Sequence, residues 1–138
     1  MKKTRFLAPY VKTKEGNYKL NIPGLSSNRR QRGVYLIKSL QTGSVIYVGK
    51  SNSHLYKTLT RHFQDWNDKR QERFVYSKAG FYSVRVVFTN TDKQTDLLEK
   101  ALILKLHPRD NKSKVDFFSR NEEFQASKVV TEYEEAPF

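Results

Sequence analysis

Two short segments rich in β-branched and aromatic residues, joined by a tight turn, constrain the fold of this chain most. Val34 to Ile37 and Val45 to Val48 have the composition of β-strands. Gln41 to Ser44, between them, has the composition of a turn. A connection this short joins antiparallel strands, because a parallel crossover needs a dozen or more residues. The sequence therefore predicts an antiparallel pair at the start of a compact unit that begins at Gly33.

Three further segments complete this predicted unit. Leu55 to Trp66 has apolar residues at helical spacing, and Phe81 to Phe88 is dense in Tyr and Val, as expected of a third strand. Thr91 to Gln94 resembles a capping box, and the helix that it opens is expected to run to about Leu106, before Pro108. The chain beyond is polar and is predicted to be irregular. The order β-β-α-β-α predicts an α+β fold with a small, three-stranded, mainly antiparallel sheet flanked by helices.

The ends of the chain differ from this unit. Tyr10 to Thr13 and Tyr18 to Ile22 flank a Glu-Gly-Asn turn, which predicts a hairpin, and a basic loop follows at residues 26–32. We therefore expect a basic N-terminal extension (1–32), a compact α+β domain (33–118) and an acidic C-terminal tail (119–138). With 138 residues, the chain has room for one main domain.

The charge of the chain indicates its class of partner. Residues 1–120 hold 25 basic and 9 acidic side chains, whereas residues 121–138 hold 1 and 5. A surface this basic attracts polyanions, of which nucleic acid is the most common in the cytoplasm; a solubility role or ribosome association is the alternative. The absence of cysteine excludes disulfides and cysteine-ligated metal sites. Neither a signal peptide nor an apolar run long enough to span a membrane is recognisable, so we expect a cytoplasmic protein without membrane contact.

Glu99 is the anomaly in the second predicted helix. On a helix it shares one face with Leu102, Ile103 and Leu106, at spacings of three, four and seven residues. Burying an unpaired carboxylate is expensive, so Glu99 needs a cation, a metal ion or several hydrogen-bond donors. A buried ion pair with an Arg or Lys from the sheet and a functional site both satisfy this requirement.

Five sequence elements follow one another in a recognisable order: Gly33-Val34-Tyr35, Tyr47-Val48-Gly49, Arg61-His62, Glu99 and Asn111. In order and spacing they closely resemble the signature of the GIY-YIG endonuclease family. The resemblance covers about Gly33 to Asn111, with Gly33 and Gly49 as structural positions of the two strand motifs. It implies a metal-dependent DNA endonuclease with a single active site, of the small stand-alone kind found in phages and mobile elements.

The resemblance also implies roles for individual residues. Glu99 would bind one divalent metal ion, Mg²⁺ or Mn²⁺, whose oxygen-rich shell keeps several waters. Tyr35 would act as general base or proton relay, although a phenol pKa near ~10 must be lowered or bridged through water. Tyr47 would hydrogen-bond the attacking water. Ordinary packing of strand tyrosines is the competing interpretation for both.

Three more residues fall within the motif or directly beside it. Lys50 and His62 would contact phosphate or assist proton transfer, and Asn111 would hold the active-site loops or bind phosphate. A core position for His62 and a turn position for Asn111 are the simpler alternatives.

One departure from the family pattern stands out. The family places an essential Arg one helical turn before the His, where this chain has Thr58. Lys57 and Arg61 are the candidates to replace it, although Lys lacks the planar fork that binds phosphate bidentately.

A basic stretch after the first predicted helix is expected to bind the phosphate backbone of nucleic acid. Its residues are Lys69, Arg70 and Arg73.

These observations leave three functions open. A DNA endonuclease leads, with DNA favoured over RNA; a catalytically weakened binding module and an RNA- or ribosome-associated basic protein are the alternatives. The acidic tail, which ends in Pro137-Phe138, is predicted to be solvated, with partner docking or self-inhibition as competing hypotheses. Substrate structure, oligomeric state and pathway have no signal in the sequence.

Overall fold

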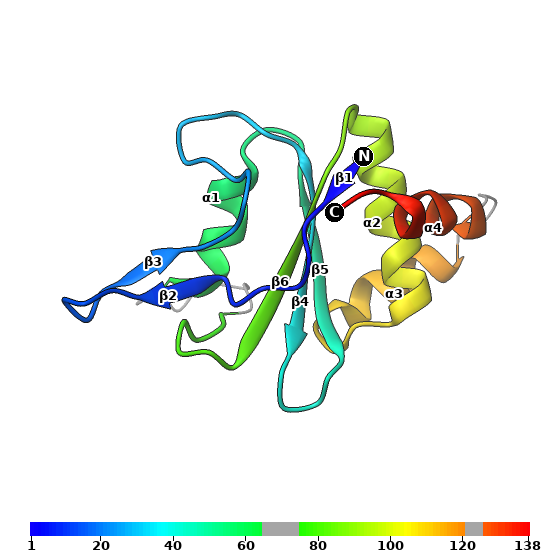
Figure 1. Ribbon diagram of the computed structural model, residues 1–138. Coiled ribbons are helices and arrows are strands. Elements are labelled where there is room, and N and C mark those ends of the chain that lie inside the picture. The colour runs from blue at the N-terminus through cyan, green and yellow to red at the C-terminus, as the bar shows by residue number, and fades with distance from the viewer. Residues whose placement is uncertain (65–74, 121–125) are drawn as a thin grey trace.

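An antiparallel sheet organises the computed structural model, which describes residues 1–64, 75–120 and 126–138 (Figure 1). Within this part of the chain the sheet has four strands in the order β1-β6-β4-β5. Their bounds are Lys2–Lys3 (β1), Tyr82–Phe88 (β6), Gly33–Ser39 (β4) and Val45–Ser51 (β5). The three predicted strands are confirmed. The two-residue β1, which pairs with β6, was not predicted because it is too short to show an alternating pattern.

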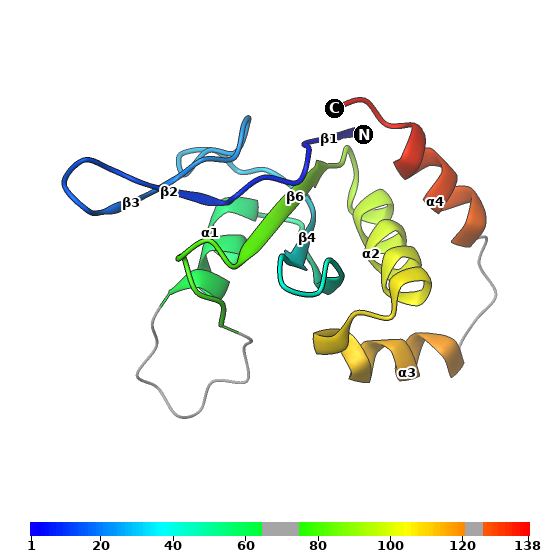
Figure 2. The ribbon, with the colours of Figure 1, turned by 60° about the horizontal axis from the view of Figure 1, so that its bottom comes forward.

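The two faces of the sheet are covered by different parts of the chain. Successive residues of β4 point to opposite faces, as strand geometry requires. On one face, Tyr35 and Ile37 belong to a core with α1 (Leu55–Thr60) and with the predicted N-terminal hairpin, now seen as β2 (Tyr10–Lys12) and β3 (Tyr18–Leu20). On the other face, Val34 and Leu36 pack with the helices of the second half (Figures 1 and 2).

The first helix is shorter than predicted. α1 ends at Thr60, and a single 3₁₀ turn continues it through Arg61–Phe63. Gln64 is already extended, and the rest of the predicted helix, including Trp66, lies outside the described residues. The tighter turn still directs His62 and Phe63 inward, where both are buried.

The second helix follows its sequence signals. α2 spans Asp92–Leu106, and the Thr91 hydroxyl accepts a hydrogen bond from the Gln94 amide at 3.1 Å. Its C-terminal cap is His107, in the left-handed conformation with φ of 45°, one residue before Pro108. Both predicted boundaries are confirmed.

The prediction of an irregular chain after Leu106 is wrong. A 3₁₀ turn at Arg109–Asn111 leads into α3 (Lys112–Arg120), and α4 spans Ala126–Glu135. The acidic C-terminal segment therefore contains a helix that packs beside α2 (Figure 2). None of the described helices combines the length and the apolar character that crossing a membrane requires.

The N-terminal and C-terminal segments of the chain are joined by hydrogen bonds. The buried Lys3 ammonium donates to the carbonyl oxygens of Tyr133 and Glu134 at 3.1 and 3.0 Å, and Lys3 N–H donates to the Pro137 carbonyl at 2.9 Å. Burial lowers the pKa of Lys3, and Arg85 nearby lowers it further. These contacts fix α4 against the sheet.

Candidate active site

A cavity of about 270 Å³ lies at the β5 edge of the sheet. It gathers side chains from β4, β5, α1 with its 3₁₀ turn, α2 and α3. The lining residues are Tyr35, Tyr47, Lys50, Thr58, Arg61, His62, Glu99 and Lys114. Six of these eight were predicted site residues. Segments far apart in the sequence thus converge on one small, cationic space.

Tyr35 and His62 are joined directly. The Tyr35 hydroxyl and His62 Nε2 share a buried hydrogen bond of 2.8 Å. Tyr35 pairs across the sheet with Gly49, and a Cβ at position 49 would overlap the end of the Tyr35 ring and its hydroxyl. Gly49 therefore makes room for the phenol. Position 33 also requires glycine, because a Cβ there would collide with the backbone carbonyl of Val87.

Aromatic rings surround His62. The Tyr47 ring centroid lies 4.7 Å from that of His62, and Tyr76 packs on the same imidazole at 5.9 Å. The Tyr76 N–H also donates to the His62 carbonyl at 2.6 Å, and its hydroxyl donates to Asp110 Oδ2 at 2.7 Å. Burial, followed by the bond to Asp110, raises the pKa of Tyr76. His62 is therefore held by its backbone and by its ring.

Glu99 is buried in α2, as the helical pattern predicts, with 3% of its side chain exposed. Its partner is Lys114 of α3, whose ammonium lies 3.3 Å from each carboxylate oxygen. Burial raises the pKa of Glu99, and Lys114 and Lys50 offset only part of this effect. The cation expected from the sheet comes instead from a helix that the sequence did not reveal.

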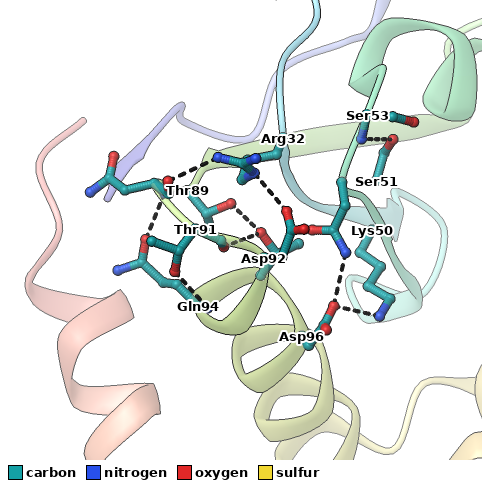
Figure 3. A network of polar contacts seen from close by, with 12 residues as sticks. Arg32, Lys50, Ser51, Ser53, Thr89, Thr91, Asp92, Gln94 and Asp96 are labelled. Carbon is teal, nitrogen blue, oxygen red and sulfur yellow. Dashed lines mark hydrogen bonds and ion pairs between the residues drawn. The ribbon is translucent and has the colours of Figure 1, made fainter.

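Lys50 is oriented by an ion pair on the surface of α2. Its ammonium lies 2.6 Å from Asp96 Oδ1, which also accepts a hydrogen bond from the Asn52 amide at 3.1 Å (Figure 3). The bond from Lys50 holds the pKa of Asp96 below its ordinary value, against the opposing effect of burial. The ion pair thus holds the Lys50 side chain in place at the wall of the cavity.

Asn111 is not among the residues that line the cavity. Its side chain is buried, accepting from the Val48 amide at 2.7 Å and donating to the Val48 carbonyl at 3.0 Å. Both polar groups of the amide are therefore engaged with the backbone of β5. Asn111 therefore joins the turn before α3 to β5, and its role in the site stays a prediction.

The two candidates for the missing Arg differ in position. Arg61 and Thr58 line the cavity, whereas Lys57 is exposed and is absent from its lining. Lys69, Arg70 and Arg73, predicted to bind nucleic acid, lie outside the described residues.

Sequence reasoning missed three residues around the site: Tyr76, Asp110 and Lys114. The spacing of Val115 and Phe118, both packed on the second core, was the available signal for α3. The contact of Lys114 with Glu99 is tertiary, so no local pattern predicts it.

The donor set suits a hard, hydrated cation. Among the described residues, no three His, Asp or Glu side chains gather to form a closed cage. Glu99 offers carboxylate oxygens at the cavity wall. Mg²⁺ is commonly held by one or two carboxylates, with waters and substrate phosphates completing its shell. The residues present therefore fit a hydrated divalent cation, for which Glu99 would be the carboxylate ligand.

Comparisons with known proteins identify the family of this chain. The family model described as a UvrC-like GIY-YIG domain matches residues 31–112. UvrABC system protein C of Syntrophotalea carbinolica is 38% identical over 80 residues, which cover 57% of this chain and 12% of that protein. The same protein of Geobacter metallireducens is 35% identical over 106 residues, or 71% of this chain and 17% of the relative.

A third relative, UvrABC system protein C of Trichlorobacter lovleyi, is 34% identical over 90 residues, 63% of this chain and 14% of that protein. No solved structure matches. The chain spans between 12% and 17% of the length of these curated relatives. The matched region contains both strand motifs, His62, Glu99 and Asn111. This chain belongs to the GIY-YIG endonuclease family, within its UvrC-like branch.

Proposed function

We propose that this chain is a metal-dependent DNA endonuclease that hydrolyses phosphodiester bonds at the cavity beside β5. The observation that carries the proposal is the convergence of Tyr35, Tyr47, His62 and Glu99 on one space of about 270 Å³. Phosphodiester hydrolysis needs a base for water, a cation at the phosphate and stabilisation of the leaving oxygen. The cavity offers a residue for each task.

The Tyr35–His62 pair supplies the proton path. With His62 Nε2 as acceptor of their 2.8 Å bond, the Tyr35 hydroxyl can pass its own proton to His62 as its oxygen takes one from water. As water attacks phosphorus, its proton passes to Tyr35 while the phenol proton passes to His62. Tyr35 thus acts without an isolated phenolate, which its ordinary pKa disfavours. Tyr47, beside both, orients the water.

The cations of the cavity bind the charged groups. Arg61 and Lys50, which line it, would contact the phosphate, and Arg61 rather than Lys57 would take the role of the family Arg. One Mg²⁺ or Mn²⁺ held by Glu99 would supply Lewis-acid stabilisation of the phosphate and the leaving oxygen. Lys114, 3.3 Å from Glu99, neutralises the carboxylate when no metal ion is bound.

The charge of this chain and its family together favour DNA as the substrate. The net charge of +12 suits a polyanion, and the matched family domain is of the UvrC-like kind. Because the chain spans only a small part of its curated relatives, the form of DNA that it cuts can differ from theirs.

A nicking assay tests the function. Supercoiled plasmid and branched DNA are incubated with Mg²⁺ or with EDTA, using wild type, Glu99→Gln and, as a matched control, Glu132→Gln on the exposed face of α4. We expect cleavage by wild type and by the control in Mg²⁺ only, and a loss of at least ~100-fold in Glu99→Gln. Cleavage that survives in Glu99→Gln would refute the assignment of Glu99.

Thr58 supports a second candidate function, a catalytically weakened nucleic-acid-binding module. Thr58 lines the cavity where the family has an Arg, and a hydroxyl cannot neutralise a phosphate. Retained DNA binding without cleavage by the wild type would favour this candidate. A strong preference for RNA over every DNA tested would instead favour an RNA-associated protein.

A further inference from the structure

A second cavity, of about 520 Å³, lies at the end of the sheet next to the candidate active site. Its cations are Arg30 and Arg32, its apolar wall is Phe88, and no acidic side chain is among its lining residues. The loop that carries Arg30 is fixed by Gln31, whose side chain accepts from the Ser26 amide at 3.0 Å and donates to the Gly24 carbonyl at 2.7 Å. The cavity is therefore built on an ordered loop.

This cavity is connected to the candidate active site through one carboxylate. Asn52 lines the second cavity and Lys50 lines the active site, and both donate to Asp96 Oδ1. Arg32 is held nearby by Asp92 at 2.9 Å and by the Asn90 carbonyl at 2.9 Å (Figure 3). The cations of the two spaces therefore follow one another along the surface.

The basic surface continues to the far edge of the sheet. A third cavity, of about 700 Å³, shares Gln31 and Phe88 with the second and adds Lys2, Arg5 and Phe138. Strand register explains the alignment, because Ser51 pairs with Gly33, Gly33 with Phe88 and Phe88 with Lys2. One row across the sheet thus runs below both cavities, from the active-site edge to β1.

We propose that these two cavities form a basic groove that binds the backbone of a DNA strand leaving the active site. This inference rests on the proposed function and extends it to the path of the substrate. Arg5 and Arg30 are exposed, and neither makes an ion pair within the described part of the chain, so both are available to phosphate. Phe88 and Phe138 offer apolar surface to sugar or base.

The sheet sets the length of this path. Crossing from β5 to β1 takes three strand spacings of about 4.8 Å, or roughly 14 Å. At about 3.4 Å per nucleotide along a duplex strand, the groove accommodates about four nucleotides. We expect affinity to rise with the length of one flank of the cleavage site and to stop rising about four nucleotides beyond it.

Charge reversal tests the groove. Arg5→Glu/Arg30→Glu is compared with Lys14→Glu/Lys19→Glu, which makes the same change in net charge on the β2–β3 hairpin. Binding of fluorescein-labelled duplex DNA is measured in EDTA between 50 and 200 mM salt, with circular dichroism to verify folding and with Arg30→Gln as a milder variant.

We expect the groove variant to bind at least ~10-fold more weakly than the hairpin control and to lose about two units of slope in log affinity against log salt. In the groove variant, the affinity should also no longer depend on the length of the flank. Equal binding by the two variants, or a wild-type affinity that ignores flank length, would overturn the groove. Tighter binding of RNA than of DNA, lost in the groove variant, would overturn its assignment to DNA.

Cleavage separates this inference from the proposed function. If wild type never cuts but the groove variant still loses DNA binding, the groove stands and the nuclease proposal fails. If wild type cuts and the groove variant binds like the hairpin control, the nuclease stands and the groove fails.

Discussion

The Lys114 ammonium lies 3.3 Å from both carboxylate oxygens of Glu99, the residue predicted to bind the metal ion. Lys114 has 45% of its side chain exposed, so its ammonium can move into solvent when a metal ion replaces it beside the carboxylate. A divalent ion that binds Glu99 must compete with this ammonium. The ion pair therefore couples metal binding to the position of the Lys114 side chain.

Removing the ammonium should strengthen metal binding. We expect Lys114→Gln to raise Mn²⁺ affinity roughly threefold, the scale of an ion pair with one exposed partner. Calorimetry, or electron paramagnetic resonance of free Mn²⁺, measures this without DNA. Lys112→Gln, an exposed lysine on the same helix, should leave the affinity unchanged. Equal affinities in the Lys114 variant and wild type would refute the competition.

Burial of the Glu99 charge should cost stability. Because burial raises the pKa of Glu99, its contribution to folding is most favourable below the unfolded-state pKa and is lost as pH rises through the folded-state pKa. Glu99→Gln removes that loss. At pH 7 we expect the substitution to stabilise the fold by about 1 kcal/mol, or roughly 3–5 °C in Tm.

The pH dependence distinguishes this cause from a packing change. The difference in Tm between Glu99→Gln and wild type should vanish near pH 4 and grow with pH, as measured by thermal melts in metal-free buffer. A constant difference across that range would contradict the electrostatic origin.

Gly49 and Tyr35 should be energetically coupled. A Cβ at position 49 would overlap the Tyr35 ring and hydroxyl, so Gly49→Ala should cost about 2 kcal/mol through overpacking. In a Tyr35→Ala background the space is empty, and the same substitution should cost under ~0.5 kcal/mol. Urea denaturation of the four proteins measures the coupling; equal costs in both backgrounds would show that the ring does not set the requirement for glycine.

Local patterns predicted much of this fold but not its tertiary contacts. β4, β5 and β6 were predicted from their β-branched and aromatic residues, and α2 from its capping box and the proline after it, because these signals lie within or next to each segment. α3 and α4 are short, and the apolar residues that identify them, such as Val115 and Tyr133, are seen to pack on a core only in the tertiary structure. The burial of Glu99 could be predicted from its own helix. Its partner Lys114 could not, because their contact depends on how two helices pack.

Asn111 should contribute to stability rather than to phosphate binding. Its amide satisfies both the N–H and the carbonyl of Val48, at 2.7 and 3.0 Å. Asn111→Ala leaves these buried groups without their partner, which should cost about 2–3 kcal/mol. Asn28→Ala, at an exposed loop position, is the control and should cost less than ~0.5 kcal/mol. Chemical denaturation reports both, and an unchanged stability in Asn111→Ala would refute the structural role.

Thr58 offers a test of whether the site lacks a catalytic cation. It lines the cavity one helical turn before His62, and its hydroxyl donates to the His54 carbonyl at 3.2 Å. An Arg there could bring a planar guanidinium to the scissile phosphate. We expect Thr58→Arg to raise the Mg²⁺-dependent nicking rate about 10-fold or more, as expected for a cation gained at the transition state.

The effect of Arg61→Ala in two backgrounds shows whether Arg61 replaces the missing catalytic Arg. If Arg61, which shares the cavity, supplies the missing charge, Arg61→Ala should lower the wild-type nicking rate at least ~10-fold. In Thr58→Arg the same change should cost under ~3-fold, because a second guanidinium already contacts the phosphate. Lys57→Ala, outside the cavity, should leave the rate unchanged in both backgrounds. Equal losses from Arg61→Ala with and without Thr58→Arg would mean that the two guanidinium groups have different roles. Arg61 would then not be the replacement for the family Arg.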